Sequence, residues 1–413
     1  MHSYKIKSNF KEIGLAVTKF EKNLPRRFNN VLGLLQGLEQ GVLTIELPDK
    51  QVFKIQGKTS GPTARIKILN NDFFARLVRE GENGFCESYL DGWWNTPDLI
   101  TLLDVLLLNG DLFGSNLPGA NVLRYYERLR HWLRSNSRAQ ARRNIAHHYD
   151  LGNDFYTKWL DETMTYSSAL FETGKETLSE AQMNKYKLIC DNLSLKPSDK
   201  VLEIGCGWGG FAEYAIKNYG VTITGLTISK EQLEYSKKRS FEAGLSDRAN
   251  FVMRDYRDEQ GIYDAIASIE MFEAVGEKYW PSYFNTVRDR LTSQGRATLQ
   301  IITIGDDFFP HYRKNVDFIQ KYIFPGGMLP SQIALKEQIE KAGLTSIKMD
   351  NFGQSYSKTL RIWHKQFNSV WTDIEPLGFD ERFKRMWNFY FASCAAFFLS
   401  RTGDVAQLTL QKG

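Results

Sequence analysis

The chain has 413 residues, of which 42% are hydrophobic, and its formal net charge at pH 7 is +5. This length allows two domains, or one large α/β domain with an appendage, and no segment approaches the roughly 18 apolar residues of a membrane-spanning helix. The first residues lack an apolar core and a small-residue cleavage site, and the four widely spaced cysteines form no metal-binding pattern. We therefore expect a reduced, cytoplasmic protein.

Residues 1–120 are predicted to form a small, separate α+β domain. Hydrophobic periodicity and turn residues predict one helix and three strands, at 28–38, 41–47, 52–55 and 64–69. The aromatic segment Tyr89–Trp94 is compatible with holding an apolar molecule, although core packing explains buried tryptophans more often.

A basic segment at 121–143 is predicted to form a linker helix. It combines a single acid, Glu127, with seven arginines, namely Arg124, Arg128, Arg130, Arg134, Arg138, Arg142 and Arg143. Apolar residues lie among them at helical spacing, so the helix has a basic and an apolar side. Such a helix fits an anionic surface, either membrane or nucleic acid, and equally fits a solvated linker between domains.

Residues 144–413 are predicted to form the main domain. Five apolar runs alternate with helical segments and predict strands at 200–204, 221–226, 249–253, 263–269 and 296–302. Strands that alternate with helices at these spacings give a mainly parallel sheet with helices on both faces. The predicted fold class is therefore α/β, with a doubly wound sheet and a smaller N-terminal domain.

A glycine-rich turn follows the first of these strands. Gly205, Gly207 and Gly210 have the spacing of a dinucleotide-binding turn between a strand and a helix. A nicotinamide cofactor would also need an acid about 20 residues further on, and that position is Gly225. The acid instead precedes the turn, as Glu203, where it can bind an ammonium group. This pattern favours S-adenosylmethionine over NAD, and a class I methyltransferase-like fold.

The ends of the next two strands carry polar residues that would face the same ligand. Thr227 and Gln232 offer hydroxyl and amide groups where a ribose would lie, and Ser229 with Gln232 also fits an N-cap on the following helix. After the third strand, Asp255 and Tyr256 would reach the adenine, because the carboxyl ends of parallel strands line the ligand crevice.

Two carboxylates follow the fourth strand, at the place where a doubly wound methyltransferase has its substrate chemistry. Glu270 and Glu273 are three residues apart, so one helical turn would put them on one face. They lie among apolar residues beside the predicted crevice, which makes them candidate catalytic groups rather than surface charges.

Six ordered motifs resemble the cyclopropane fatty acid synthase family. They lie at 146–156, 164–169, 205–210, 225–232, 271–276 and 321–327. The resemblance covers about residue 80 to the end, and more weakly links the Tyr89–Trp94 segment to the family's N-terminal lipid-handling module. It implies methyl transfer from S-adenosylmethionine to a cis double bond of an acyl chain, and cofactor contacts from Tyr166, Ser167, Gly205, Thr227, Gln232, Asp255 and Tyr256.

The resemblance also implies a bicarbonate ion that removes a proton so that the ring closes. In the family this ion is held by a cysteine through its backbone, a glutamate, a histidine, an isoleucine and a tyrosine. Glu273 and Tyr322 match the glutamate and tyrosine, and Ile304 matches the isoleucine. Two positions depart from the pattern, because Ser168 replaces the cysteine and Ile302 replaces the histidine. Losing a charge-assisted hydrogen bond costs about 1.5–3 kcal/mol.

A carbocation on the substrate would be stabilised by carboxylates and aromatic faces. The candidates for this role are Glu270, Glu273, Tyr149, Tyr322, Phe272 and Phe324. The sequence therefore predicts a lipid methyltransferase that acts on phospholipid acyl chains and forms a cyclopropane ring. Two alternatives remain open: methylation without ring closure, and a soluble small-molecule N-methyltransferase. We expect peripheral binding to the anionic inner membrane surface, no nucleic-acid partner and a homodimer.

Overall fold

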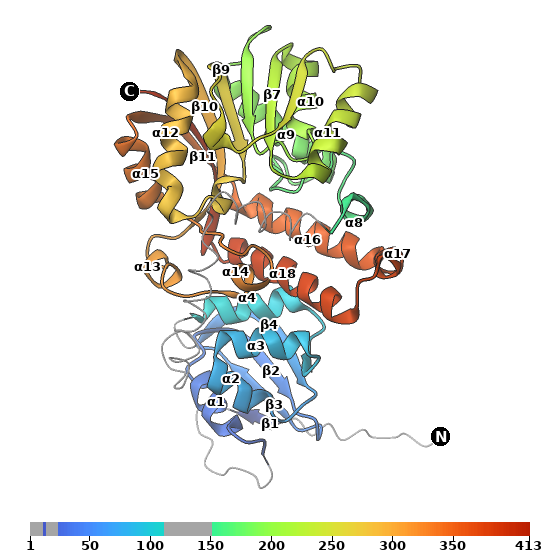
Figure 1. Cartoon of the computed structure of the whole chain (residues 1–413). Coiled ribbons are helices and arrows are strands. Elements are labelled where there is room, and N and C mark those ends of the chain that lie inside the picture. The colour runs from blue at the N-terminus through green and yellow to red at the C-terminus, as the bar shows by residue number, and fades with distance from the viewer. Residues whose placement is uncertain (1–10, 14–23, 111–150) are drawn as a thin grey trace. The chain divides into compact units, whose positions relative to one another are not determined.

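The computed structural model describes residues 11–13, 24–110 and 151–413. The predicted basic linker helix at 121–143 lies outside these residues. Contacts between residues divide the chain into two compact units, which Figure 1 shows in the colours of the sequence. Among the described residues, the first unit contains 11–13, 24–110 and 379–400, and the second contains 151–378 and 401–413.

The first unit is built on a five-stranded mixed sheet with the order β1-β3-β2-β4-β5. Its strands are β1 (Lys11–Ile13), β2 (Gln40–Glu46), β3 (Val52–Gln56), β4 (Thr59–Ile68) and β5 (Trp94–Asn95). The hairpin of β2 and β3 is antiparallel, as the turn at 48–51 predicts, whereas β2 and β4 are parallel. Helices α1 (Phe28–Leu35), α2 (Phe73–Glu80), α3 (Glu82–Leu90) and α4 (Leu99–Leu108) belong to the same unit.

A helix from the far end of the chain completes this unit. α18 (Glu381–Leu399) packs on α4 and α3, and its Arg385 guanidinium donates to the backbone oxygens of Tyr89 and Trp94 at 2.5 and 2.8 Å. The same guanidinium lies 4.0 Å from the ring centre of Tyr89. The predicted domain boundaries place all of 144–413 in one domain, whereas these contacts assign 379–400 to the first unit.

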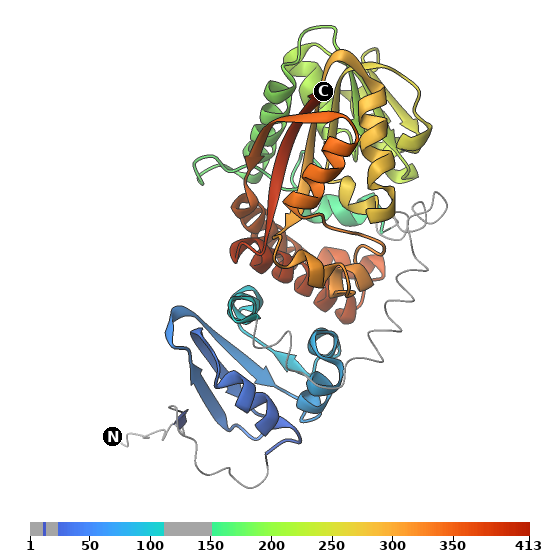
Figure 2. The same ribbon diagram turned by 90° about the vertical axis from the view of Figure 1, so that its left-hand side faces the viewer.

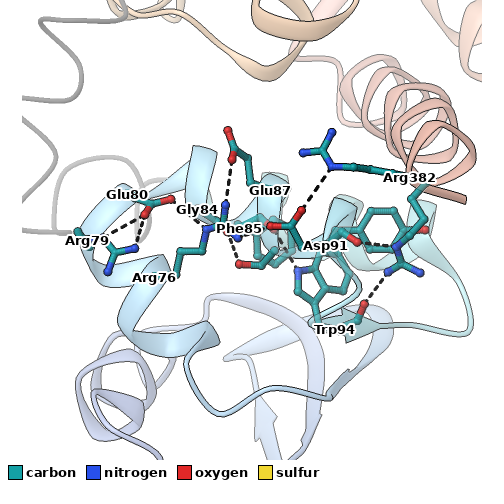
Figure 3. Close-up of polar contacts among 12 residues, drawn as sticks. Arg76, Arg79, Glu80, Gly84, Phe85, Glu87, Asp91, Trp94 and Arg382 are labelled. Atoms are coloured by element: carbon teal, nitrogen blue, oxygen red, sulfur yellow. Dashed lines mark hydrogen bonds and ion pairs between the residues drawn. The ribbon is translucent and has the colours of Figure 1, made fainter. Parts of the chain in front are cut away.

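Ion pairs surround this contact on α2 and α3 (Figure 3). Arg76 is largely buried and pairs with three acids, Glu80, Glu87 and Asp91, at distances of 2.7–3.1 Å. Arg382 of α18 reaches the same Asp91 at 3.4 Å. A buried guanidinium with several carboxylate partners fixes the relative positions of its elements better than a single exposed ion pair does.

The second unit contains a seven-stranded sheet with the order β11-β12-β10-β9-β6-β7-β8. Its strands are β6 (Lys200–Ile204), β7 (Thr222–Thr227), β8 (Ala249–Met253), β9 (Tyr263–Ile269), β10 (Leu291–Ile304), β11 (Leu344–Asn351) and β12 (Gly403–Lys412). The five strands from β10 to β8 are parallel, and β12 is antiparallel to both β10 and β11. Figure 2 shows the dark red β12 beside β11. The predicted doubly wound, mainly parallel sheet is confirmed.

Helices cover both faces of this sheet (Figure 1). One face packs against α9 (Leu178–Leu193), α10 (Gly210–Tyr219) and α11 (Lys230–Glu242), and the other packs against α12 (Trp280–Arg290) and α15 (Gln332–Lys341). The strand order reverses between β6 and β9, because the chain runs outward from β6 to β8 and then returns. Ligands of doubly wound sheets bind at the carboxyl ends of the strands at such a reversal.

The remaining helices of this unit lie in the connections that precede and follow the sheet strands. They are α8 (Asn153–Trp159), α13 (Phe309–Tyr312), α14 (Phe318–Tyr322), α16 (Gly353–Ser369) and α17 (Trp371–Ile374). Among the helices that the structure describes, none is long and apolar enough to cross a membrane.

Arg385 gives a direct test of the contact between α18 and α3. Replacing Arg385 with Met removes two charged hydrogen bonds to backbone oxygens, each worth about 1.5–3 kcal/mol. We expect the amide hydrogens of 381–399 to exchange at least about tenfold faster, measured by mass spectrometry. Arg382→Met is the matched control, because it removes one exposed ion pair and should change exchange less than about threefold. Equal changes in amide exchange with both variants would contradict the role of Arg385 in holding α18 on α3.

Candidate active site

The glycine turn lies where the sheet order reverses. β6 ends at Ile204, and Gly205 follows with a φ of 83°, a backbone conformation that side chains disfavour. A Cβ atom at Gly205 would lie 2.8 Å from the Cγ atom of Met271, so only glycine fits there. The turn therefore touches the segment that carries Glu270 and Glu273.

Glu203 lies on β6 just before this turn and is 2% exposed. Its Oε2 atom is buried without a hydrogen-bond partner in the described part of the chain. Burial raises the pKa of this carboxyl well above its usual value, and the positive charges of Lys185 and Arg239 oppose that rise. A buried carboxylate oxygen without a donor fits a ligand that carries a cationic N–H group.

Polar groups at the end of β7 form a short chain of hydrogen bonds. The Thr227 hydroxyl contacts Oε1 of Gln232 at 2.9 Å, and the backbone N–H of Ser229 donates to the same hydroxyl. Ser229 also caps α11 by accepting from the backbone N–H of Gln232 at 3.3 Å. The predicted cap is therefore present, and it holds Thr227 and Gln232 together at the carboxyl edge of the sheet.

The residues after β8 are arranged around an ion pair. Asp255 accepts from the side chain of Arg257 at 2.5 and 2.8 Å and also caps a short 3₁₀ helix. The Tyr256 hydroxyl is buried without a hydrogen-bond partner among the described residues. Burial raises the pKa of this hydroxyl. Both predicted residues lie at the edge expected for the adenine, and their roles stay predictions.

A hydrogen bond that was not predicted from the sequence also holds the glycine turn in place. The indole nitrogen of Trp208 donates to the Asn153 side chain at 2.7 Å. Asn153 begins α8 and donates in turn to the backbone oxygen of Glu231 at 3.3 Å. Asn153 thus joins α8, the glycine turn and the start of α11.

Glu270 stands at the end of β9 with a φ of 47°, which is uncommon for any residue other than glycine. Its carboxylate accepts three hydrogen bonds, from the Ser168 backbone N–H, the Gln300 side chain and the Tyr356 hydroxyl, each at 2.8 Å. These donors lower the pKa of Glu270, while burial raises it more strongly, so the net shift is upward.

Glu273 lies one turn further along the same segment. Its Oε1 accepts from the Ile302 backbone N–H at 2.5 Å, and its Oε2 is buried without a partner among the described residues. Burial, reinforced by the charge of Glu270, raises the pKa of Glu273 to about 8. Near neutral pH Glu273 therefore holds a proton more firmly than an ordinary glutamate does.

A buried lysine lies behind this pair. Lys185 of α9 is fully buried and donates to the Ser167 hydroxyl at 2.7 Å. Burial lowers the pKa of Lys185 to about 7, and the charges of Glu270, Asp161 and Glu203 oppose the shift. Each of these acids gains in turn from the lysine's positive charge.

Two buried glutamines connect the carboxylate pair to the lysine helix. Gln300 of β10 donates to Glu270 and accepts from the Gln407 side chain at 3.1 Å. Gln407 of β12 also donates to the backbone oxygen of Lys185 at 3.4 Å. This network fixes Glu270 from two strands, β10 and β12, and one helix, α9.

Aromatic rings surround the predicted cofactor residue Tyr166. Its ring centre lies 5.2–5.6 Å from those of Tyr156, Trp159 and Trp363. Of these, Trp363 comes from the apolar stripe of α16, while the other two belong to α8. Tilted and edge-on rings packed in this way exclude water from the polar groups beside them.

The remaining predicted residues have the following positions. Tyr322 ends α14, with its ring 5.2 Å from that of Phe318, and its role stays a prediction. Ile304 is buried and its backbone N–H donates to the Pro330 oxygen at 3.0 Å. Tyr149 lies outside the described residues. The tyrosine hydroxyl that contacts the carboxylate pair belongs to Tyr356, which sequence reasoning did not name.

The residues at the predicted bicarbonate site do not fit that ion. The backbone N–H groups of Ser168, Ile302 and Ile304 already donate to Glu270, Glu273 and Pro330, respectively. The histidine of the family pattern is an isoleucine, so no cationic donor replaces it at that position. The Glu270 carboxylate would in addition repel another anion.

The fold and the glycine turn define a class I methyltransferase architecture. One solved structure, a coclaurine N-methyltransferase bound to N-methylheliamine and SAH, has a TM-score of 0.63 to this chain, covering 79% of it and 98% of that structure, at 18% identity. At that identity the likeness concerns the fold alone.

Within this architecture, sequence similarity identifies a particular family. The family model described as mycolic acid cyclopropane synthetase matches residues 136–408. The chain is 37% identical to the cyclopropane-fatty-acyl-phospholipid synthase of Escherichia coli strain K12, over 85% of this chain and 88% of that protein. It is also 37% identical to the tuberculostearic acid methyltransferase UfaA1 of Mycobacterium tuberculosis, over 81% and 80%.

Among solved structures, that of the mycolic acid cyclopropane synthase CmaA1 complexed with SAH and CTAB aligns with a TM-score of 0.62. The two sequences are 31% identical, and the alignment covers 66% of this chain and 98% of CmaA1. The chain belongs to the cyclopropane synthase family.

The raised pKa of Glu273 makes the stability of the second unit depend on pH. Between the usual carboxyl pKa near 4.5 and about 8, the folded state holds a proton that the unfolded state releases. Stability should therefore fall as pH rises through this range, by up to about 1.4 kcal/mol per pH unit. Glu273→Gln should remove this part of the slope, measured by urea unfolding between about pH 5 and 9. Parallel pH profiles of the two proteins would contradict the assignment.

Lys185 should matter for stability far more than another lysine of the same helix. Lys185→Met leaves buried acids without their cation and should cost about 3 kcal/mol in the free energy of unfolding. Lys187, two residues on, forms an exposed ion pair with Asp191, so Lys187→Met should cost less than about 0.5 kcal/mol. Urea unfolding compares the two, and equal costs would show that the buried charge cluster is unimportant.

Proposed function

We propose that this protein transfers a methyl group from S-adenosylmethionine to the cis double bond of an unsaturated phospholipid acyl chain. The contact between Gly205 and Met271 carries the proposal, because it puts the glycine turn directly beside the segment of Glu270 and Glu273. A ligand held at the turn therefore lies next to two buried carboxylates.

The groups around the turn suit this cofactor. Glu203 offers a carboxylate oxygen for the ammonium group, and Thr227 with Gln232 offers hydroxyl and amide groups for the ribose. When bound, the cofactor supplies an electrophilic methyl group on a sulfonium. The structure of CmaA1, a member of the same family, is a complex with SAH.

The chain's own residues position the substrate and stabilise charge. The Glu270 carboxylate would place negative charge beside the alkene carbon that becomes positive, and the Glu273 carboxyl would place polar oxygen atoms there. The rings of Tyr166 and Trp363 exclude water, which would otherwise capture that cation. The hydrogen bonds to Glu270 keep its carboxylate in one orientation, so no reorganisation is needed during the reaction.

Two different products can form from the carbocation on the acyl chain. Ring closure gives a cyclopropane, in keeping with the name of the Escherichia coli relative, the cyclopropane-fatty-acyl-phospholipid synthase. Methylation without ring closure is the second outcome, favoured by Ile302 at the histidine position and by a relative named tuberculostearic acid methyltransferase.

We place the reaction at the cytoplasmic face of an anionic membrane, where the basic segment 121–143 would bind phospholipid headgroups. The first unit would help to hold the acyl chain, and the protein would work as a homodimer.

The test is product analysis with vesicles of a cis-unsaturated phosphatidylglycerol and methyl-¹³C S-adenosylmethionine. We expect ¹³C label in the acyl chains, with upfield ring-proton signals in the NMR spectrum if the product is a cyclopropane. A methylene-branched chain has the same mass, so NMR rather than mass alone distinguishes the products. Label confined to a soluble amine would favour an N-methyltransferase and contradict the proposal.

Glu273→Gln and Glu277→Gln provide the matched pair for this assay. The first replaces the buried carboxyl that accepts from the Ile302 N–H, and should lower turnover at least about 100-fold with little change in cofactor affinity measured by calorimetry. The second replaces an acid that pairs with Arg313 nearer the surface, and should retain activity.

A further inference from the structure

We propose that the Glu270 carboxylate acts as the built-in proton acceptor of this active site, in place of a bound bicarbonate ion. The inference rests on the proposed function for its chemistry, because it concerns the proton that leaves the substrate after methyl transfer. It differs from the family pattern given by the sequence resemblance, which requires an anion from solution.

The position of the Glu270 carboxylate supports its role in place of the bicarbonate ion. The resemblance assigns the backbone of residue 168 to the ion, and the Ser168 N–H donates to Oε1 of Glu270 instead. Gln300 gives Oε1 a second donor, while Oε2 accepts from the Tyr356 hydroxyl alone among the described residues. Oε1 is therefore saturated, and Oε2 keeps a lone pair that can accept a proton.

The backbone at Glu270 carries a cost that a functional side chain would explain. Its φ of 47° lies in the left-handed region, which is unfavourable for a residue with a side chain. Glycine would avoid that cost, yet the position holds a glutamate whose side chain enters the buried network. Strained backbone that persists in a rigid setting is typical of active sites.

Glu273 is less suited to the same role. It shares the segment, but its Oε1 is bound to the Ile302 N–H, and its carboxyl keeps a proton near neutral pH. Lys185 lies behind Glu270 and favours its ionised form. We therefore assign proton acceptance to Glu270 and a positioning role to Glu273, whose Oε1 holds the Ile302 backbone.

The proton transfer balances without a further reactant. The alkene's π electrons form a bond to the methyl carbon, and the carbon–sulfur bond breaks toward sulfur. Oε2 of Glu270 then takes one proton from the transferred methyl carbon, and the C–H electron pair closes the ring onto the cationic carbon. Glu270 later releases the proton to solvent. The net reaction yields one cyclopropane, the demethylated cofactor and one proton.

The experiment compares the full-length protein in bicarbonate-free and bicarbonate-supplemented buffer. We expect equal rates in both, and no broadening of the ¹³C NMR line of added ¹³C-bicarbonate by the protein. Glu270→Gln should lower turnover at least about 100-fold without rescue, because the amide fills the space. Glu270→Gly suits the backbone at this position and opens that space. It should lose activity to a similar extent, recover at least about tenfold on adding bicarbonate, and broaden the bicarbonate line.

Calorimetry with S-adenosylmethionine shows whether each variant is folded and binds its cofactor. A wild-type rate that falls at least about tenfold without bicarbonate, or saturable bicarbonate binding to the wild type, would overturn the inference. If the wild type methylates no unsaturated phospholipid in either buffer, the proposed function fails. The bicarbonate line with wild type and Glu270→Gly then still decides whether Glu270 occupies the anion position.

Discussion

Burying several carboxylates in one place is costly, and the second unit depends on how that cost is offset. Lys185 is buried near Glu203, Glu270 and Asp161, which lie on different segments of the chain. An isolated buried charge is unstable, whereas charges of opposite sign with satisfied hydrogen bonds hold one another in place. The lysine therefore links the strand before the glycine turn, the carboxylate segment and the loop before Tyr166.

The same arrangement makes the site rigid before any ligand arrives. Gln300 and Gln407 lie on neighbouring antiparallel strands and pass hydrogen bonds from Glu270 to the backbone of α9. A carboxylate held in this way stabilises a developing positive charge without first reorienting. The orientation of Glu270 at the sheet edge thus depends on buried residues of β10, β12 and α9.

Much of the fold could be predicted from local patterns. The expected strands at 200–204, 249–253 and 263–269 coincide with β6, β8 and β9, because each is an apolar run between turn residues. β10 begins at Leu291 rather than at 296, since its polar first residues pair irregularly with β9.

The site was harder to predict, because its key contacts join distant segments. The glycine turn and the acids at 203, 270 and 273 follow from spacing and from the ends of strands. Lys185 does not, since a lysine in a helix is normally exposed, and only the fold reveals its acidic neighbours. Tyr356 is likewise 86 residues from Glu270, and its hydroxyl is one of many aromatic candidates in the sequence. The sequence of α18 is typical of a helix, but nothing in it indicates that this helix packs on α4.

The position of α18 and β12 in the chain has a consequence for synthesis on the ribosome. The first unit lacks its last helix until residue 399 has been made, although its sheet is complete by residue 95. Among the described strands β11 pairs only with β12, so it too waits for residues 403–412. Each unit therefore completes its fold only after residues 379–412 have been made, and a chain cut before residue 379 leaves both units incomplete.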